Sequence, residues 1–336
     1  MGQRHPRVKG TLLFVTAAVL SSCVGSDTGP GVRATEPDRR LRVGHNTVVR
    51  VDSASGRVEA VVPVGPDPLL LTTTLDQVWT LNLGDGTLSR VDPVTNAATT
   101  VRIGEAVGFA SNGPDLWVAV DGNRLVRIDG GTGTQETSLR LGRRQLFALR
   151  DAGFPAIGHG SIWLTVPVLG RSDLPNILWR LDPKTGRVIT RIRIGPDPLP
   201  PLIDGRYIWI VSLDGLSRID VRTQEVRMVV PSAGPGVGPW GVAAGAGSVW
   251  MGQQYGEVWR IDPETTRPTA KIPVDGPPRG LAIGGGLLWV TTETALLSID
   301  PATNEVARMV PLTTQIMDEG PIGVAYLDGS VWVSVE

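Results

Sequence analysis

The sequence predicts an all-β fold: a seven-bladed β-propeller whose ring is closed by N-terminal outer strands pairing with C-terminal inner strands. Two repeated markers, in phase along the chain, predict this fold. The first is a stretch centred on an aspartate, which reads RLDPKTGRV at residues 180–188. It occurs seven times, with its aspartates at Asp52, Asp92, Asp129, Asp182, Asp220, Asp262 and Asp300. Such a period, about 40 residues, is typical of propellers and solenoid arrays.

The second marker is an aliphatic residue followed by tryptophan, at Trp79, Trp117, Trp163, Trp209, Trp250, Trp289 and Trp332. Each of the first six tryptophans precedes an aspartate of the first marker. Trp332 has no such aspartate after it, and Asp52 has no such tryptophan before it. One blade is therefore split, with inner strands from the C-terminus and outer strands from residues 44–64. Closing the ring in this way removes exposed sheet edges.

Within one repeat, the residues around Trp250 predict four strands, at 241–244, 248–252, 257–261 and 269–274. Valine, isoleucine and tryptophan favour strands, and Gly and Pro residues separate them. The apolar residues do not alternate cleanly with polar ones. This is expected when neighbouring blades cover both faces of a sheet.

The aspartate of each repeat predicts a tight turn between the third and fourth strands. An Asp side chain accepts hydrogen bonds from backbone N–H groups further along the turn, and Gly or Asn tolerates the left-handed residue that follows. A feature present in every blade is structural, so we interpret neither the turns nor the seven tryptophans as a ligand site. The arginine two residues before the aspartate, present in six of seven copies, is expected at the surface or between blades as a partner of these carboxylates.

The N-terminus predicts export and a lipid anchor. Residues 1–22 contain Arg4, Arg7 and Lys9, then a short apolar run, as in a secretory signal peptide. Residues 20–23, LSSC, resemble the bacterial lipobox, which implies cleavage before Cys23 and lipidation of that residue. Cys23 is the only cysteine in the chain. The alternative is an incidental cysteine in an ordinary signal peptide.

The predicted domains are a lipoprotein signal peptide at 1–22, a lipidated cysteine and flexible tether at 23–42, and the propeller at 43–336. The tether is polar and contains Gly and Pro without periodicity. Removing the three positive charges of residues 1–22 moves the formal net charge from −1 to −4. This negative charge argues against nucleic acid as a partner. The lipid anchor and the tether together predict a protein at the outer face of the cytoplasmic membrane.

The repeat P-x-G-[VL]-A…G-x-G-x-[VL]-W-V…R-I-D-P-x-T, over residues 44–336, resembles bacterial seven-bladed propellers of the YVTN and NHL kind, including virginiamycin B lyase-like proteins. The lyase resemblance implies histidines and an acid near a metal on one face of the ring. The chain after residue 22 has only His45 and His159. His45 aligns with the connection between second and third strands, and His159 with the turn between first and second strands. These connections open on opposite faces, so the two histidines cannot share a metal.

Loops on a rigid scaffold often carry function, and the loops of one face are the longest here. A segment at 142–156, with Arg144, and a loop at 166–176, with Asp173, fall on that face in the blade of Trp163. Counting ten residues back from each marker tryptophan gives the expected mouth of the central pore: Leu69, Val107, Gly153, Leu199, Trp240, Arg279 and Ile322. Arg279 beside Trp240 is suited to an anionic or aromatic group; the alternative is an ordinary solvated arginine.

Two hypotheses of function follow. The first is a membrane-anchored, non-catalytic module, without a cofactor, that binds a protein, a cell-wall fragment or a small molecule through its long-loop face. The second is a lyase or lactonase with a divalent metal, using dispersed loop residues: His45, Tyr255, Glu293 and Asp318. We favour the first because the sequence offers no nucleophile–base pair and no clustered metal ligands.

The anchor gives the first testable prediction. Cys23→Ala is expected to move the protein from the membrane fraction to the soluble fraction, because the thiol that carries the lipid is lost. Ser26→Ala, three residues downstream, is the matched control and is expected to stay with the membrane. Fractionation of cells expressing each full-length variant measures the outcome. A Cys23→Ala variant that still needs detergent for its extraction would reject lipidation.

Overall fold

The computed structural model describes residues 41–120, 123–141, 153–166, 176–232, 241–312 and 320–336. The chain divides into a unit of Met1–Gly31 and a unit of Val32–Glu336, and all described residues belong to the second. Among them the structure has no helix long and apolar enough to cross a membrane. Arg144, Asp173, Trp240 and Cys23, which the sequence analysis singled out, lie outside the described residues, as do Asp318 and Glu319.

The described residues form 28 strands in seven four-stranded antiparallel sheets. We number these sheets as blades 1 to 7, and give the strands of each from the innermost to the outermost. Blades 1 to 3 are β3 (Pro68–Thr73), β4 (Val78–Asn82), β5 (Thr87–Val91), β6 (Ala98–Val101); β7 (Ala106–Ser111), β8 (Asp115–Val120), β9 (Arg124–Asp129), β10 (Gln135–Arg140); and β11 (Pro155–Gly158), β12 (Ser161–Val166), β13 (Asn176–Leu181), β14 (Val188–Ile194).

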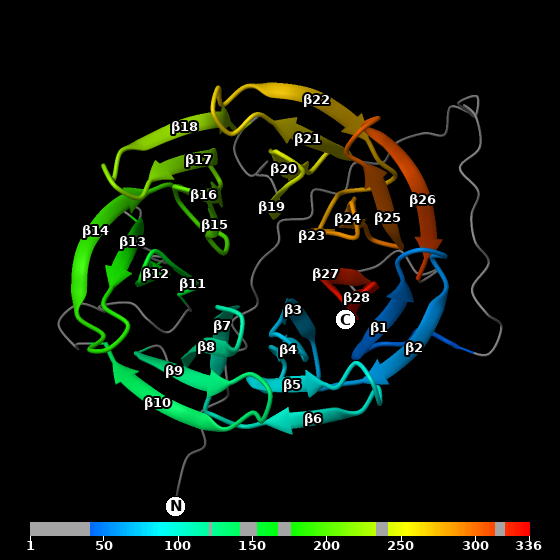
Figure 1. Ribbon diagram of the computed structural model, residues 1–336, viewed down its shortest axis with the longest axis horizontal. Helices are drawn as coiled ribbons and strands as arrows, with labels where there is room; N and C mark the ends of the chain where they lie inside the picture. The colour runs from blue at the N-terminus through cyan, green and yellow to red at the C-terminus, as the bar shows by residue number, and fades with distance from the viewer. Residues whose placement is uncertain (1–40, 121–122, 142–152, 167–175, 233–240, 313–319) are drawn as a thin grey trace, which may run out of the picture. The chain divides into compact units, whose positions relative to one another are not determined.

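Blades 4 to 6 are β15 (Leu202–Asp204), β16 (Tyr207–Ser212), β17 (Gly215–Asp220), β18 (Val226–Pro231); β19 (Gly241–Gly245), β20 (Ser248–Gln253), β21 (Glu257–Ile261), β22 (Pro268–Pro273); and β23 (Leu281–Gly284), β24 (Leu287–Thr291), β25 (Ala295–Asp300), β26 (Glu305–Pro311). Blade 7 is β27 (Pro321–Leu327), β28 (Ser330–Val335), β1 (Thr47–Asp52), β2 (Val58–Pro63). Figure 1 shows the blades following one another around a ring, with their first strands at the centre. The predicted fold is confirmed.

Blade 7 closes the ring as predicted. Its inner strands come from the C-terminus and its outer strands from the N-terminal part of the propeller. β1 pairs antiparallel with β28, from Thr47 opposite Val335 to Asp52 opposite Ser330. The ends of the chain are thus joined by a sheet, with no covalent link. In blade 5, each predicted strand boundary agrees with the structure to within one residue.

The hydrophobic core lies between blades. Each marker tryptophan is on the second strand of its blade and is buried, with Trp117 the most exposed at 5%. Trp250 of blade 5 packs in one cluster with Leu288 and Val290 of blade 6. Second strands such as β20 are buried on both faces along almost their whole length, because each face contacts a different neighbour. This explains why the sequence lacks the alternation of a half-exposed sheet.

The aspartate turns have the predicted hydrogen bonds. Asp182 Oδ1 accepts from the amides of Lys184 and Thr185, at 3.0 and 2.7 Å, and from the Thr185 hydroxyl at 2.8 Å. The fourth residue after the aspartate has a positive φ in every repeat: Gly56, Asn96, Gly133, Gly186, Gln224, Thr266 and Asn304. The stretch RLDPKTGRV is therefore a structural turn.

In four of the repeats, the arginine that precedes the turn links two blades. In blade 5, Arg260 lies opposite Trp250 in the strand register, with its guanidinium carbon 5.1 Å from the ring centroid. Its Nε donates to Ser248 Oγ at 2.8 Å, and its Nη1 donates to Pro301 O, in the turn of blade 6, at 2.7 Å. We call this arrangement the arginine clamp. In the described residues, equivalent bonds to the next turn come from Arg50, Arg90 and Arg218.

The clamp confirms the expected inter-blade position but corrects the expected partner. The acceptors in the neighbouring turn are backbone carbonyl oxygens, together with Asn304 Oδ1 for Arg260. The aspartate carboxylates do not fill this role, because they point inward to the amides of their own turn. Each clamp arginine therefore bonds to a turn of the next blade, and the shape of that turn is already fixed by the aspartate of the same turn.

Blade 6 has Ser298 where the other blades have the arginine, and the structure compensates. Ser298 lies opposite Trp289 on one side and opposite Arg308, on β26, on the other. Arg308 donates to Ser53 O and Ala54 O in the turn of blade 7, at 3.2 and 2.8 Å. A guanidinium thus reaches the next turn from the outer strand instead.

We expect the arginine clamp to contribute to the free energy of unfolding of the propeller. Arg260→Ala is expected to destabilise the propeller by about 2–3 kcal/mol, because charged hydrogen bonds and a cation–π contact are lost. Arg260→Lys is expected to recover little of this, since one ammonium cannot replace a guanidinium that is stacked and bonded at two nitrogens. The exposed Arg267→Ala is the matched control. Urea unfolding measures all three, and equal midpoints for Arg260→Ala and Arg267→Ala would contradict the prediction.

The aspartate turns predict loss of stability in acid. The Thr185 hydroxyl and amide, with the Lys184 amide, lower the pKa of Asp182 below its ordinary range, and the corresponding bonds do the same in four other turns. The pKa of Asp220 is also lowered, by the Arg206 guanidinium first and then by the amides of its turn. A lowered folded-state pKa stabilises the fold above the unfolded-state pKa, about 3.9, and this contribution disappears as the pH falls through the folded-state value. Stability should therefore fall below about pH 4.

Asp182→Asn keeps an acceptor in the turn but cannot ionise. We expect this variant to be less stable at pH 7 and to lose less stability between pH 4 and pH 2 than the unaltered protein. Asp275→Asn, at an exposed position outside the turns, controls for the loss of one negative charge. Urea titrations across this pH range measure the slopes, and identical slopes for Asp182→Asn and the unaltered protein would refute the role of the turn carboxylate.

Candidate functional site

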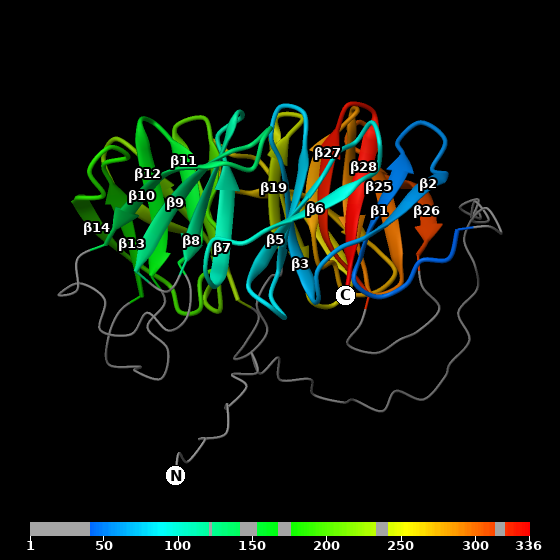
Figure 2. The same ribbon diagram turned by 90° about the horizontal axis from the view of Figure 1, so that it is seen from below.

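The strands run between two faces of the ring, seen edge-on in Figure 2. The turn face carries the turns between first and second strands and the aspartate turns. The loop face carries the connections from second to third strands and from one blade to the next. Its described connections include residues 44–46, 64–67, 83–86, 102–105, 195–201, 213–214, 254–256, 274–280 and 292–294.

Two predicted site residues meet in blade 6. Arg279 lies two residues before β23, and its amide donates to Thr291 O at 2.8 Å. This bond places its side chain beside the loop after β24, where Glu293 lies. Arg279 Nη2 is 3.7 Å from Glu293 Oε1, with the two side chains 20% and 40% exposed. Arg279 thus forms an ion pair with Glu293 at the surface. An anionic ligand that binds the Arg279 guanidinium would have to share it with Glu293.

The other two described candidates lie on the flanking blades. Tyr255 is in the loop between β20 and β21 of blade 5 and is 74% exposed. His45 lies two residues before β1 of blade 7, and its Nδ1 is 3.0 Å from Glu336 O. The four described candidates therefore share the loop face of three consecutive blades, 5, 6 and 7.

The second histidine is at the other face, as the sequence analysis expected. His159 is in the turn between β11 and β12, and its Nε2 is 2.8 Å from Gly205 O in the corresponding turn of blade 4. Within the part of the chain that the structure describes, no group of three or more His, Cys, Asp or Glu side chains is placed to hold a metal ion.

A cavity of about 370 Å³ lies at the centre of the ring, between the first strands of blades 1 to 5. Among the described residues, its lining is formed by 70–72, 109–111, 155–157 and 200–203, and by Val242. Twelve of these fourteen residues are apolar, and the others are Thr72 and Ser111. The repeat pattern predicted only the mouth of this channel, although the apolar residues just after the counted positions, such as Leu70 after Leu69, carried the signal for its wall.

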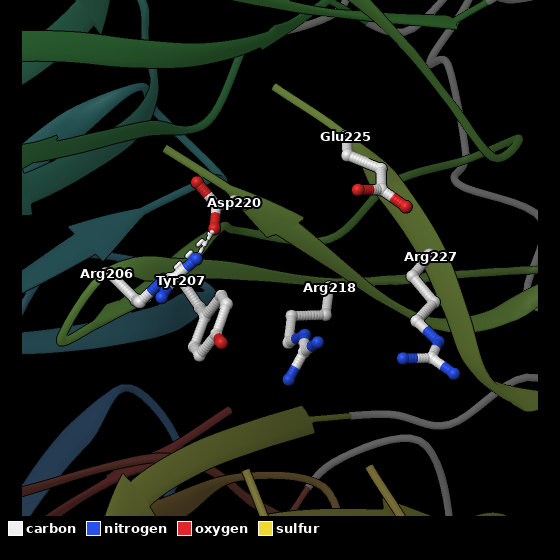
Figure 3. Close-up of a pocket in the computed structure, with 6 residues that line it drawn as sticks. All are labelled: Arg206, Tyr207, Arg218, Asp220, Glu225 and Arg227. Atoms are coloured by element: carbon white, nitrogen blue, oxygen red, sulfur yellow. Dashed lines mark hydrogen bonds and ion pairs between the residues drawn. The ribbon is translucent and has the colours of Figure 1, made fainter. Parts of the chain in front are cut away.

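A smaller cavity, of about 150 Å³, lies at the turn end of blade 4 (Figure 3) and was not predicted. The ring of Tyr207 lies against two guanidiniums, with the carbons of Arg206 and Arg218 at 5.1 and 4.1 Å from its centroid. Arg206 Nε donates to Asp220 Oδ2 at 3.0 Å, and Figure 3 shows this pair. The Arg206 guanidinium is the main cause of the strongly lowered pKa of Asp220.

The groups that line this smaller cavity include the arginine clamp of blade 4, which is made by Arg218. Tyr207 stands two residues before Trp209, at the position that Ser248 has before Trp250. Arg218 donates to Pro263 O in the next blade, as other clamp arginines do. The signal in the sequence was the large aromatic residue at a position where three other blades have serine: Ser161, Ser248 and Ser330. Of its charged groups, Arg218 bonds to blade 5, whereas Arg206 and Asp220 pair within blade 4.

No family model and no curated protein matches this chain. Solved structures do match it. Apo AztD from Citrobacter koseri is 14% identical, with 86% of each chain covered and a TM-score of 0.60. Hydrazine synthase from Kuenenia stuttgartiensis is 16% identical, with 81% of this chain and 90% of that chain covered and a TM-score of 0.61. Dihydro-heme d1 dehydrogenase NirN in complex with DHE is 18% identical, with 87% and 68% covered and a TM-score of 0.56. At these identities the likeness establishes the propeller fold.

Proposed function

We propose that the protein is a lipid-anchored, extracytoplasmic β-propeller that binds a partner molecule through the loop face of blades 5 to 7, without catalysing a reaction. One observation carries the proposal: three consecutive blades present Tyr255, the Arg279–Glu293 pair and His45 on one face. Exposed aromatic residues and arginines are the groups that recognition surfaces use most. The rigid blades beneath hold the loops that carry them.

The bonds of the acidic and basic side chains support binding over catalysis. The aspartates of the repeats accept hydrogen bonds from their own turns, and six of them have lowered pKa values. A carboxylate with a lowered pKa is a weak base near neutral pH. His45 lies against Glu336 O, so a metal-dependent lyase or lactonase would have to break this contact to use its Nδ1 as a ligand.

The anchor and the family rest on the sequence. The N-terminal 22 residues have the character of a signal peptide, and Cys23 stands at the lipidation position. A tether of residues 24–42 spans at most about 65 Å when fully extended, and it leads to the loop face, where β1 begins at Thr47. The partner would then lie in the cell envelope near the membrane. The repeat pattern resembles that of YVTN- and NHL-like propellers, and NirN, similar in fold, was solved with DHE bound.

Site-specific photo-crosslinking on intact cells tests the loop face. A photoreactive phenylalanine analogue replaces Tyr255 in the full-length protein, and in a matched control it replaces Val94, which is 87% exposed on the turn face. We expect a discrete crosslinked species from position 255 and none from position 94. Adding Arg279→Ala to the first variant should weaken the crosslink about tenfold, as loss of a central interface arginine commonly does. Crosslinks only from position 94, or none from position 255, would refute the loop face as the binding surface.

A further inference from the structure

We infer that the central channel is a second binding site, for an uncharged and predominantly apolar small molecule. Its cavity of about 370 Å³ falls within the usual range of small-molecule sites, about 300–1,000 Å³. None of its fourteen lining residues is charged, in a chain of which 19% is charged. Such a wall favours uncharged ligands, because a charged ligand would lose its hydration on entering the channel and would find no side chain of opposite charge among the described lining residues.

The side chains of the described lining offer few hydrogen bonds. Thr72 and Ser111 supply its side-chain hydroxyls, and Ser111 Oγ already accepts from the amide of Gly113 at 3.1 Å. The other hydrogen bonds in the channel come from the backbone at the free edges of the first strands, where Pro155, Pro200 and Pro201 have no N–H group to donate. A ligand therefore meets mostly apolar side chains and needs few polar groups of its own.

The wall is also preformed. Leu70 packs on the core between blades 1 and 2, and Leu71 on the core between blades 7 and 1. Ile203 and Leu202 pack on the cores at either side of blade 4. Because these side chains are fixed by the blades, a ligand orders little of the protein on binding, which favours affinity.

The site is independent of the proposed loop-face function. The channel is lined by blades 1 to 5, whereas the loop-face candidates belong to blades 5, 6 and 7. Its two hydroxyls indicate a ligand with at most one or two polar groups along an apolar body.

Fluorescence titration with N-phenyl-1-naphthylamine, an uncharged aromatic probe, tests the inference on the full-length protein. Its sulfonated analogue, 1-anilinonaphthalene-8-sulfonate, tests the requirement for an uncharged ligand. Thr72→Arg and Ala110→Glu put opposite charges into the channel at half-buried lining positions that belong to none of the hydrophobic clusters. Thr100→Arg and Ala98→Glu make the same changes on the exposed outer strand β6 of blade 1 and are the matched controls. Thermal unfolding of all four variants establishes that each is folded.

We expect the uncharged probe to bind with one-to-one stoichiometry and the sulfonated probe to bind at least about tenfold more weakly. Both channel variants should weaken the uncharged probe about tenfold or more, whatever the sign of the charge, and both controls should leave it unchanged. No binding, or equal weakening by Ala98→Glu and Ala110→Glu, would overturn the site. Tighter binding of the sulfonated probe to Thr72→Arg, together with weaker binding to Ala110→Glu, would overturn the class of ligand and indicate an anion. Neither result depends on the crosslink from position 255.

Discussion

The structure depends on the contact that joins the second and third strands of one blade to the aspartate turn of the next. A single four-stranded sheet cannot bury both of its faces, so each blade needs two neighbours. Trp250 supplies apolar area to one such interface, and Arg260, stacked on it, crosses to Pro301 O. Because the turn receives this bond in a fixed shape, the clamp helps to position one blade relative to the next at each interface where it occurs. The pairing of β1 with β28 then closes the ring without a covalent link.

The same contact limits where function can lie. Near the turn face, the aspartates shape their own turns and the clamp arginines join neighbouring blades, and the groups beside the smaller cavity at Tyr207 show both roles. There, Arg206 pairs with Asp220, and Arg218 bonds to the next blade. The groups left for recognition are at the opposite face and along the central channel. The loop-face side chains do not contribute to the clamps, so they can differ in sequence while the ring stays intact.

The loop face and the channel differ in chemistry. On the loop face, an exposed tyrosine, an ion pair and a histidine suit a polar or mixed surface of a partner. The channel wall is apolar and narrow, and suits a small molecule that buries most of its surface.

The sequence by itself determined the number of blades, the split blade, the strands of blade 5 and the aspartate turn, because these depend on period and on contacts between near neighbours in the chain. It also assigned Tyr255, Glu293, His45 and Arg279 to loops before or after particular strands. Only the tertiary structure decided that Arg279 pairs with Glu293, that clamp arginines bond to carbonyl oxygens, and that Arg308 replaces the arginine missing at Ser298. These contacts join residues of different loops, strands or blades, and their partners follow from strand register and blade packing, which a repeat pattern does not encode.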